Sequence, residues 1–306
     1  MQLSTLAAFA GCGAVAAAAY GVLVEQFAIR VREIELTFPD LPPAFDGSVI
    51  LHLSDLHITK LGLLERRLMD LVSGRRVDMC FVTGDIAQEP SACEVFRVIC
   101  SAIKGPETIY GVLGNSEHKP WIDTPKLVQA LSFEGFRLLT NDSCVISRQD
   151  DSIRIVGVDD AYSQLAEVDR AFRGVDPAEF IVFLTHCPSA APRAVERGAR
   201  LILAGHTHGG QVRVPFLGPL WTHMRANKKL NDGLYVLDRL GRRLYSTRRP
   251  GARAGVPIAA CARSTRSDAS ECRAVLYVSR GVGTSKLHIR FLCPPEIAYI
   301  TLRRSP

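Results

Sequence analysis

The sequence contains no pair of cysteines in CxxC spacing, although nine cysteines are scattered along its 306 residues. The odd count and the irregular spacing argue against a disulfide framework and against a cysteine-ligated zinc site. Several of these cysteines stand in apolar runs, where we expect the thiol to pack as a small hydrophobic side chain. No internal repeat of solenoid length occurs, so the chain is not a stack of repeated units.

A broadly distributed basic charge is also missing. The net charge is +6, but residues 239–273 alone hold nine arginines against two acidic residues, which leaves the rest of the chain close to neutral. Nucleic-acid binders usually present a basic face on the fold itself, so we expect no nucleic-acid partner. Residues 239–273 contain few large apolar side chains, and we interpret them as a flexible Arg-rich insertion.

Charged residues are absent between Leu3 and Val24, a run of 22 residues that is long enough to cross a bilayer as a helix. No Lys or Arg precedes the run, so the positive start of a signal peptide is missing. We predict an N-terminal transmembrane helix that anchors the chain through residues 1–30. A cleaved signal peptide, a lipoprotein site at Cys12 and a buried soluble helix are the alternatives.

The arginines that follow this run predict its orientation. Arg30 and Arg32 lie just after it, and the positive-inside rule then places the main domain on the cytoplasmic side. We therefore expect a single-pass protein of a bacterial inner membrane, with the membrane and a membrane lipid or nucleotide-linked lipid as its partners.

The remaining residues, 48–306, are predicted to form one domain in which strands and helices alternate. Apolar runs rich in β-branched residues predict strands over 48–55, 78–85, 108–115, 153–160, 180–187 and 199–206. Helical periodicity is found between them over 63–73 and 91–103, and "EIAYITL" predicts a last strand. This alternation is typical of an α/β fold, in which ligands bind at the carboxyl ends of the strands.

Polar side chains stand at those predicted strand ends. They occur in the motifs SDLH, TGD, GNSEH, THC and AGHTHGG, and the candidate metal ligands are Asp55, His57, Asp85, Asn115, His186, His206 and His208. Mixed oxygen and nitrogen donors without thiolate suit Mn²⁺, Fe²⁺ or Zn²⁺. Seven donors exceed what one ion needs, so we predict two divalent ions, about 3.5–4 Å apart, that share a carboxylate. Such a pair would activate water and polarise a phosphoryl oxygen.

These motifs, in this order, resemble the calcineurin-like metallophosphoesterases. That family shows D-x-H, G-D, G-N-H-[DE], a lone H and G-H-x-H, and the resemblance implies a four-layer α/β/β/α sandwich. It implies that one metal is held by Asp55, His57, Asp85 and His208, and the other by Asp85, Asn115, His186 and His206. Asp85 would bridge the two, and Asp85 and Asn115 would belong to the catalytic set. Mn²⁺ is the ion we favour.

Ser116 departs from the family pattern, which has a histidine there to protonate the leaving group. Serine is no proton donor near pH 7, so poor leaving groups should suffer more than a nucleotide monophosphate. His118, two residues on, is the candidate replacement acid. Glu117 is expected to hold a histidine ligand, and Arg213 and Arg280 are candidate ligands of the substrate phosphate.

The segments GHTHGGQVRVP and SRGVGTSKLHIRFLCPPEI further resemble the branch that includes UDP-2,3-diacylglucosamine pyrophosphatases. We therefore expect a dinuclear hydrolase that cuts this lipid nucleotide to UMP and a lipid 1-phosphate in lipid A synthesis. A less selective phosphodiesterase or phosphatase is the second hypothesis. A membrane-bound module that keeps its metal without catalysis is the third.

Overall fold

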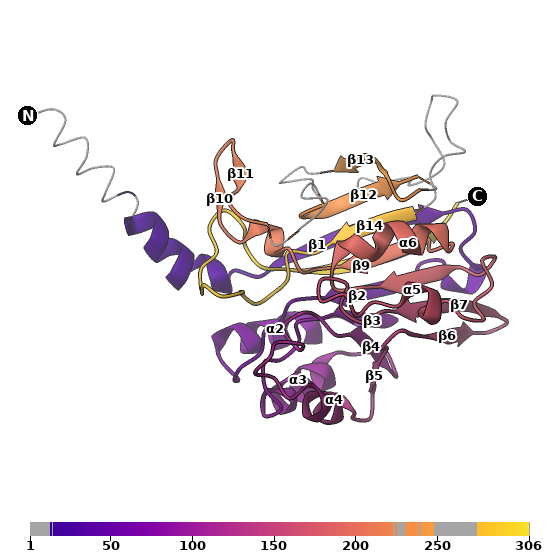
Figure 1. Ribbon diagram of the computed structural model, residues 1–306, viewed down its shortest axis with the longest axis horizontal. Helices are drawn as coiled ribbons and strands as arrows, with labels where there is room; N and C mark the ends of the chain where they lie inside the picture. The colour runs from indigo at the N-terminus through magenta and orange to yellow at the C-terminus, as the bar shows by residue number, and fades with distance from the viewer. Residues whose placement is uncertain are drawn as a thin grey trace, which may run out of the picture.

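The computed structural model describes residues 13, 15–222, 224, 230–238, 240–247 and 274–305. Two β-sheets form its centre (Figure 1). The first sheet has the strand order β1 (Arg30–Phe38), β15 (Glu296–Arg304), β2 (Val49–Leu53), β3 (Met79–Thr83), β4 (Ile109–Val112) and β5 (Phe136–Leu138). Strands β2 to β5 are parallel, β15 runs antiparallel to β2, and β1 runs parallel to β15.

The second sheet is also mixed. Its strand order is β13 (Arg243–Thr247), β12 (Gly233–Leu237), β14 (Ala274–Val278), β9 (Leu201–Ala204), β8 (Ile181–Leu184), β7 (Asp151–Gly157) and β6 (Asp142–Arg148). The four strands from β14 to β7 are parallel, and antiparallel strands flank them on both sides. A separate short hairpin consists of β10 (Arg213–Val214) and β11 (Gly218–Pro219).

Helices cover the outer face of each sheet. The first sheet packs on α2 (Leu63–Ser73), α3 (Ala92–Ala102) and α4 (Thr124–Leu131), and the second on α5 (Val168–Ala171) and α6 (Ala191–Glu196). Short 3₁₀ turns occur at Glu25–Phe27, Pro43–Phe45, Pro188–Ala190 and His208–Gly210. In α3 the buried residues Phe96, Ile99 and Cys100 recur at helical spacing, which turns one face of the helix to the sheet. The layers are thus helix, sheet, sheet and helix.

The core between the two sheets is formed by large apolar side chains from both. Phe81 and Ile300 of the first sheet pack in the same buried cluster as Val182 and Leu203 of the second. These strands are apolar on both faces because one face meets helices and the other meets the opposite sheet. The six cysteines within the described ranges are buried thiols, which confirms their predicted packing role.

The predicted α/β fold is confirmed, and each strand and helix predicted within residues 48–306 has a counterpart in the structure. Strand β1 was not predicted, although the alternation of charged and apolar residues in Arg30–Phe38 is the pattern of an edge strand. Strand β13 lies inside the predicted insertion, where pairing with β12 satisfies its backbone. Residues 239 and 248–273 of that insertion lie outside the described part of the chain.

The predicted single-pass localisation in an inner membrane is wrong. Residues 15–23 are helical, but no helix among the residues that the structure describes is long and apolar enough to cross a membrane. This finding also leaves the predicted N-terminal transmembrane helix without support. Residues 1–12 and 14 of the predicted span lie outside the described ranges.

The core between the sheets predicts a large stability effect at Phe81. Phe81→Ala should lower the free energy of unfolding by about 3–5 kcal/mol, because it removes a fully buried ring from a layer that both sheets line. Urea unfolding followed by circular dichroism measures the change. Val145→Ala, at a side chain that is 44% exposed on β6, is the control and should stay within about 0.5 kcal/mol. Equal effects of the two changes would contradict this assignment of the core.

Candidate metal centre

The predicted ligands converge at one edge of the sandwich. All of them lie in loops at the carboxyl ends of β2, β3, β4, β8 and β9, and six of the seven are buried, whereas Asn115 is half-buried. Three of these strands belong to the first sheet and two to the second. The site therefore forms only because the two sheets are stacked.

A first group of donors consists of Asp55, His57, Asp85 and His208. Their nearest ligand atoms all lie within 4.8 Å of one another, and this is a group that can hold a metal ion. His57 Nε2 lies 3.2 Å from His208 Nε2 and 3.2 Å from Asp85 Oδ2. His208 Nε2 lies 3.4 Å from Asp55 Oδ1. Oxygen and nitrogen donors at these separations surround a space that suits one small cation.

A second group of donors lies on the other side of Asp85. Asp85 Oδ1 is 3.4 Å from His186 Nε2. Asn115 Oδ1 is 3.2 Å from the same nitrogen and 2.8 Å from His206 Nδ1. The two imidazoles approach each other to 3.2 Å, measured from His206 Nδ1 to His186 Nε2. Asp85 thus offers one carboxylate oxygen to each group.

The electrostatics of the site favour bound positive charge. His186 Nδ1 donates to the carbonyl of Thr83 at 2.9 Å, so in the neutral ring Nε2 carries the lone pair that faces the donor groups. Burial lowers the pKa of His186, but the carboxylates of Asp85 and Asp55 outweigh it and raise this pKa to about 9. Burial likewise opposes ionisation of Asp85, yet His186 and His57 hold its pKa well below the usual range. The negative charge of these carboxylates, which holds a proton on His186, would equally stabilise a divalent cation.

Strained backbone aims these side chains at one another. The left-handed region, with φ between 47° and 71°, is occupied by Asp55, His57, Asp85, His206 and His208. This region costs non-glycine residues about 1–2 kcal/mol each, and such strain persists where the surrounding structure over-determines it. Five of the seven predicted ligands are therefore held in place by the backbone of their own loops.

Glu117 supplies part of that support. Its buried carboxylate accepts main-chain N–H groups of Asp85 at 3.1 Å, Ile86 at 2.6 Å and Gly114 at 2.7 Å. Burial raises the pKa of Glu117 to about 7, and these N–H donors oppose the rise. The expectation that Glu117 holds a histidine ligand is wrong: it joins the loop after β3 to the loop after β4 through their backbones.

Ser116 and His118 take different positions in the loop after β4. The Ser116 N–H donates to Asp85 Oδ1 at 2.8 Å, which fixes the oxygen that faces the second group. The half-buried His118 pairs with Asp159 after β7, with 2.6 Å between Nε2 and Oδ1. That hydrogen bond is the main reason why the pKa of His118 is raised. Catalytic roles for Asp85, Asn115 and His118 stay predictions.

Arg213 and Arg280 are engaged by one carboxylate rather than left open for substrate. Arg213 Nη1 lies 3.1 Å from one oxygen of Asp232, and Arg280 Nη2 lies 2.9 Å from the other. Arg213 also donates to the carbonyl of Gly209 at 3.2 Å. Both arginines support the turn that carries His206 and His208. A substrate phosphate would have to compete with Asp232, and their predicted role in binding it stays untested.

Three residues near the ligands were not predicted. Gln88 Nε2 lies 3.3 Å from His57 Nδ1, the Tyr162 ring lies 4.8 Å from the His206 ring, and Asp159 pairs with His118. Asp159 stands at the end of the predicted strand 153–160, so its position was visible in the sequence. Its partner was not, because the pairing joins loops 41 residues apart.

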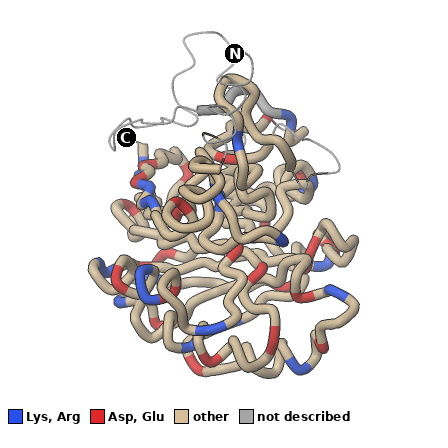
Figure 2. The backbone as a smooth tube through the Cα atoms, turned by 90° about the vertical axis from the view of Figure 1, so that its left-hand side faces the viewer, with Lys and Arg blue, Asp and Glu red and all other residues tan. Residues whose placement is uncertain are grey.

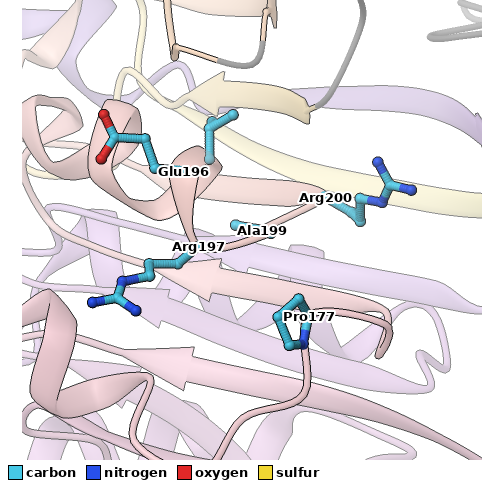
Figure 3. Close-up of a pocket in the computed structure, with 7 residues that line it drawn as sticks. Pro177, Glu196, Arg197, Ala199 and Arg200 are labelled. Carbon is cyan, nitrogen blue, oxygen red and sulfur yellow. The ribbon is translucent and has the colours of Figure 1, made fainter. Parts of the chain in front are cut away.

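A hollow of about 310 Å³ at the opposite edge of the second sheet is a separate feature (Figure 3). Pro177, Arg197 and Arg200 contribute to its lining, and the two arginines point to opposite sides. Arg197 pairs with Asp169, and Arg200 pairs with Asp40. It lies at the start of β9, whereas the metal centre lies at the end of that strand, so it is no part of the centre.

The close packing around Gly205 gives a test of the first donor group. A Cβ atom at this position would collide with Ser54 Oγ and Asp55 Oδ2. Gly205→Ala should displace the Asp55 carboxylate and weaken Mn²⁺ binding about 10- to 100-fold, as loss of an orienting contact does at other metal sites. Isothermal titration calorimetry measures the affinity. Gly74→Ala, where the added Cβ meets only ordinary contacts, should leave it unchanged. Unchanged affinity in Gly205→Ala would contradict the proposed donor role of Asp55.

Comparison with known proteins identifies the family. Residues 48–210 match the family model described as calcineurin-like phosphoesterase, which is more than half of the chain. The uncharacterized metallophosphoesterase YkuE of Bacillus subtilis is 26% identical over 290 residues, covering 93% of this chain and 89% of its own length. The UDP-2,3-diacylglucosamine pyrophosphatase LpxG of Chlamydia muridarum is 22% identical and covers 92% of both chains. Its counterpart in Chlamydia trachomatis is 29% identical, covering 61% of this chain and 47% of its own length. The chain belongs to the calcineurin-like phosphoesterase family, whose members are hydrolases of phosphoester bonds.

Proposed function

We propose that the chain is a dinuclear metal-dependent hydrolase of a phosphoanhydride, with UDP-2,3-diacylglucosamine as its substrate. The observation that carries the proposal is the position of Asp85, whose two oxygens face two separate donor groups at 3.2 and 3.4 Å. A carboxylate shared in this way is what a pair of ions requires. Water would add to one phosphorus, the P–O–P bond would break, and UMP and a lipid 1-phosphate would leave.

Each donor group would hold one ion. The first would be held by Asp55, His57, Asp85 and His208, and the second by Asp85, Asn115, His186 and His206. When bound, the pair of ions supplies an activated water and neutralises charge on the phosphoryl oxygens. The donor set, with three oxygen and four imidazole donors, suits Mn²⁺, Fe²⁺ or Zn²⁺, and Mn²⁺ is the ion we favour. The strained loops and the Glu117 carboxylate keep the donors in place during the reaction.

Ser116 supports an anhydride as the substrate. It stands where the family pattern has a histidine, and its N–H is committed to Asp85. A nucleotide monophosphate is a good leaving group and needs little protonation, whereas an alkoxide needs an acid. Two relatives named as UDP-2,3-diacylglucosamine pyrophosphatases support the choice of this particular anhydride.

We infer that His118 supplies the proton when the leaving group needs one. Asp159 raises its pKa, which keeps the imidazole protonated to higher pH than a free histidine. Asp159 belongs to the same loop as Tyr162, whose ring lies against the candidate ligand His206. The dyad thus joins the loop that carries Asn115 to the loop that carries Tyr162.

Turnover by the purified protein tests the substrate. With Mn²⁺ present, UDP-2,3-diacylglucosamine should be hydrolysed at least tenfold more efficiently than an aryl phosphodiester or an aryl monoester, with UMP as a product. EDTA should abolish all turnover, and Mn²⁺ should restore it. Equal or better turnover of the aryl diester would favour a broad phosphodiesterase instead and would end the lipid nucleotide proposal.

The dinuclear arrangement is tested separately from the substrate. His57→Ala and His206→Ala remove one donor from each group, and each should lower turnover of the aryl diester by at least 100-fold. Binding stoichiometry, measured by calorimetry or by bound-metal analysis, should fall from two Mn²⁺ per chain toward one. Val98→Ala, on the exposed side of α3, is the control. Stoichiometry of one in the parent protein would contradict the proposal.

Proton donation by His118 gives a leaving-group and pH prediction. His118→Gln should slow cleavage of an alkyl phosphodiester about 100-fold, the range of acid catalysis, and change aryl diester turnover little. The alkyl reaction should lose rate as pH rises through the raised pKa of His118. Asp159→Asn removes the main cause of that raised pKa, so the loss should move to lower pH. An equal effect on both esters, or an unmoved pH profile in Asp159→Asn, would contradict the acid role.

A further inference from the structure

Large apolar side chains are exposed on two neighbouring segments, which together we call the apolar ridge. The β10–β11 hairpin and the two residues after it expose Phe216, Leu217, Leu220 and Trp221, at 109%, 81%, 63% and 68%. The loop 284–292 exposes Leu287 at 68% and Leu292 at 47%. Apolar residues that gather on a surface in this way mark a site of interaction, because single exposed residues are common but clusters are not.

Hydrogen bonds join the loop 284–292 to the hairpin and to Gln211, two residues before it. The Gln211 side chain donates to the carbonyls of Ser285 at 3.2 Å and Leu287 at 2.6 Å. The Arg213 N–H donates to the carbonyl of Phe291 at 2.9 Å. Figure 1 shows the hairpin projecting beside this loop and the N-terminal helix. The ridge is therefore one fixed surface and not two independent loops.

The loop of the ridge satisfies its polar groups from within. Arg290 is fully buried and donates to the carbonyls of Gly283, Cys293 and Arg280. Glu25 accepts the N–H groups of Leu292 at 3.0 Å and Cys293 at 2.6 Å. Buried polar groups of the loop thus pair inside the protein, while its apolar side chains point outward. A loop that enters an apolar medium needs its polar groups paired internally and its apolar side chains outside, because unpaired polar groups are costly there.

The ridge adjoins the metal centre. A Cβ on Gly210 would collide with Pro219 of the hairpin, so the hairpin packs directly against the chain two residues after His208. From the other segment, Cys293 Sγ lies 3.3 Å from the His208 carbonyl. Whatever the ridge contacts is consequently brought to the edge of the metal centre.

Charge on the ridge has one sign. Residues 211–222 and 282–295 contain no Asp or Glu, and Lys286 and His288 are exposed beside Leu287. Figure 2 views the molecule from the side on which the hairpin lies, with Lys and Arg in blue and Asp and Glu in red. Exposed apolar side chains accompanied only by basic ones complement a layer of anionic lipids, in which acyl chains lie beneath negative headgroups.

We propose that the apolar ridge inserts into the surface of an anionic lipid layer and holds the metal centre beside the lipid headgroups. Phe216 and Leu217 at the tip of the hairpin would enter the acyl region, and Trp221 would lie at the interface, where its ring is favoured. Lys286 would contact the headgroups. This contact is independent of the substrate proposed above, since it needs no turnover.

Fluorescence of Trp221 tests the insertion directly. The chain has two tryptophans, so the full-length Trp121→Phe protein reports on Trp221 alone. With vesicles of phosphatidylcholine and phosphatidylglycerol, its emission should shift to shorter wavelength, and brominated acyl chains should quench it. Unchanged emission and no quenching, while the protein sediments with the vesicles, would overturn the proposal.

Paired substitutions measure how much the ridge contributes. The double variant Phe216→Ser and Leu217→Ser should bind these vesicles at least tenfold more weakly in co-sedimentation. The matched control, Val98→Ser and Val145→Ser, changes two exposed apolar residues away from the ridge and should bind like the parent. Aryl diester turnover should be unchanged in both, which separates a failure of lipid binding from a failure of the enzyme proposal.

Two results would reject a lipid partner. Equal vesicle affinity of the ridge variant and the control would show that the ridge does not contact lipid. Self-association of the parent in sedimentation velocity, abolished in the ridge variant and unaffected by vesicles, would assign the ridge to an interface between copies of the chain.

Discussion

The packing of the two sheets against each other is the constraint on which the metal centre depends. Three of the contributing strands belong to the first sheet and two to the second, so neither sheet holds a complete set of donors. His186 from the second sheet donates to the Thr83 carbonyl of the first, which ties the two halves at the site itself. The apolar layer between the sheets thereby sets the distance from Asp85 to His186. The packing that stabilises the core therefore also fixes the geometry of the site, because sliding one sheet over the other would separate the donors.

The loops at the site are held at a cost in local stability. Five candidate ligands adopt left-handed backbone, and two pairs of imidazole nitrogens approach each other to 3.2 Å. Glu117 offsets part of this cost by accepting four main-chain N–H groups in the dry interior, where hydrogen bonds are strengthened by the low local dielectric. Bound cations would offset the rest of this cost, because donor atoms that repel one another would then coordinate the same ion.

Sequence reasoning reached the fold class and the strand ends at which the candidate donors converge, because each is encoded locally. An apolar run followed by a polar cluster marks a strand end, and strand ends of parallel sheets meet at one edge. It failed where the partner is remote or the pattern is ambiguous. The pairing of His118 with Asp159, the capture of Arg213 and Arg280 by Asp232, and the backbone role of Glu117 depend on contacts between distant loops. The apolar run Leu3–Val24 has the composition of a membrane-spanning helix, but composition alone does not determine how long a helix the chain forms.

The arrangement of charge and apolar surface around the centre fits a substrate that is itself divided. A lipid-linked anhydride has a charged end that must reach the donors and an apolar end that resists transfer into water, at about 0.8 kcal/mol for each CH₂ exposed. An enzyme in solution would have to extract those chains or enclose them. In the proposed arrangement, a ridge whose hairpin packs against Gly210 would remove that cost, since the chains would stay in lipid while the pyrophosphate reaches the metal centre. Ser116 in place of the loop histidine is consistent with the same proposed substrate. With a leaving group that needs no acid, the loop after β4 is free to fix Asp85 through its backbone instead.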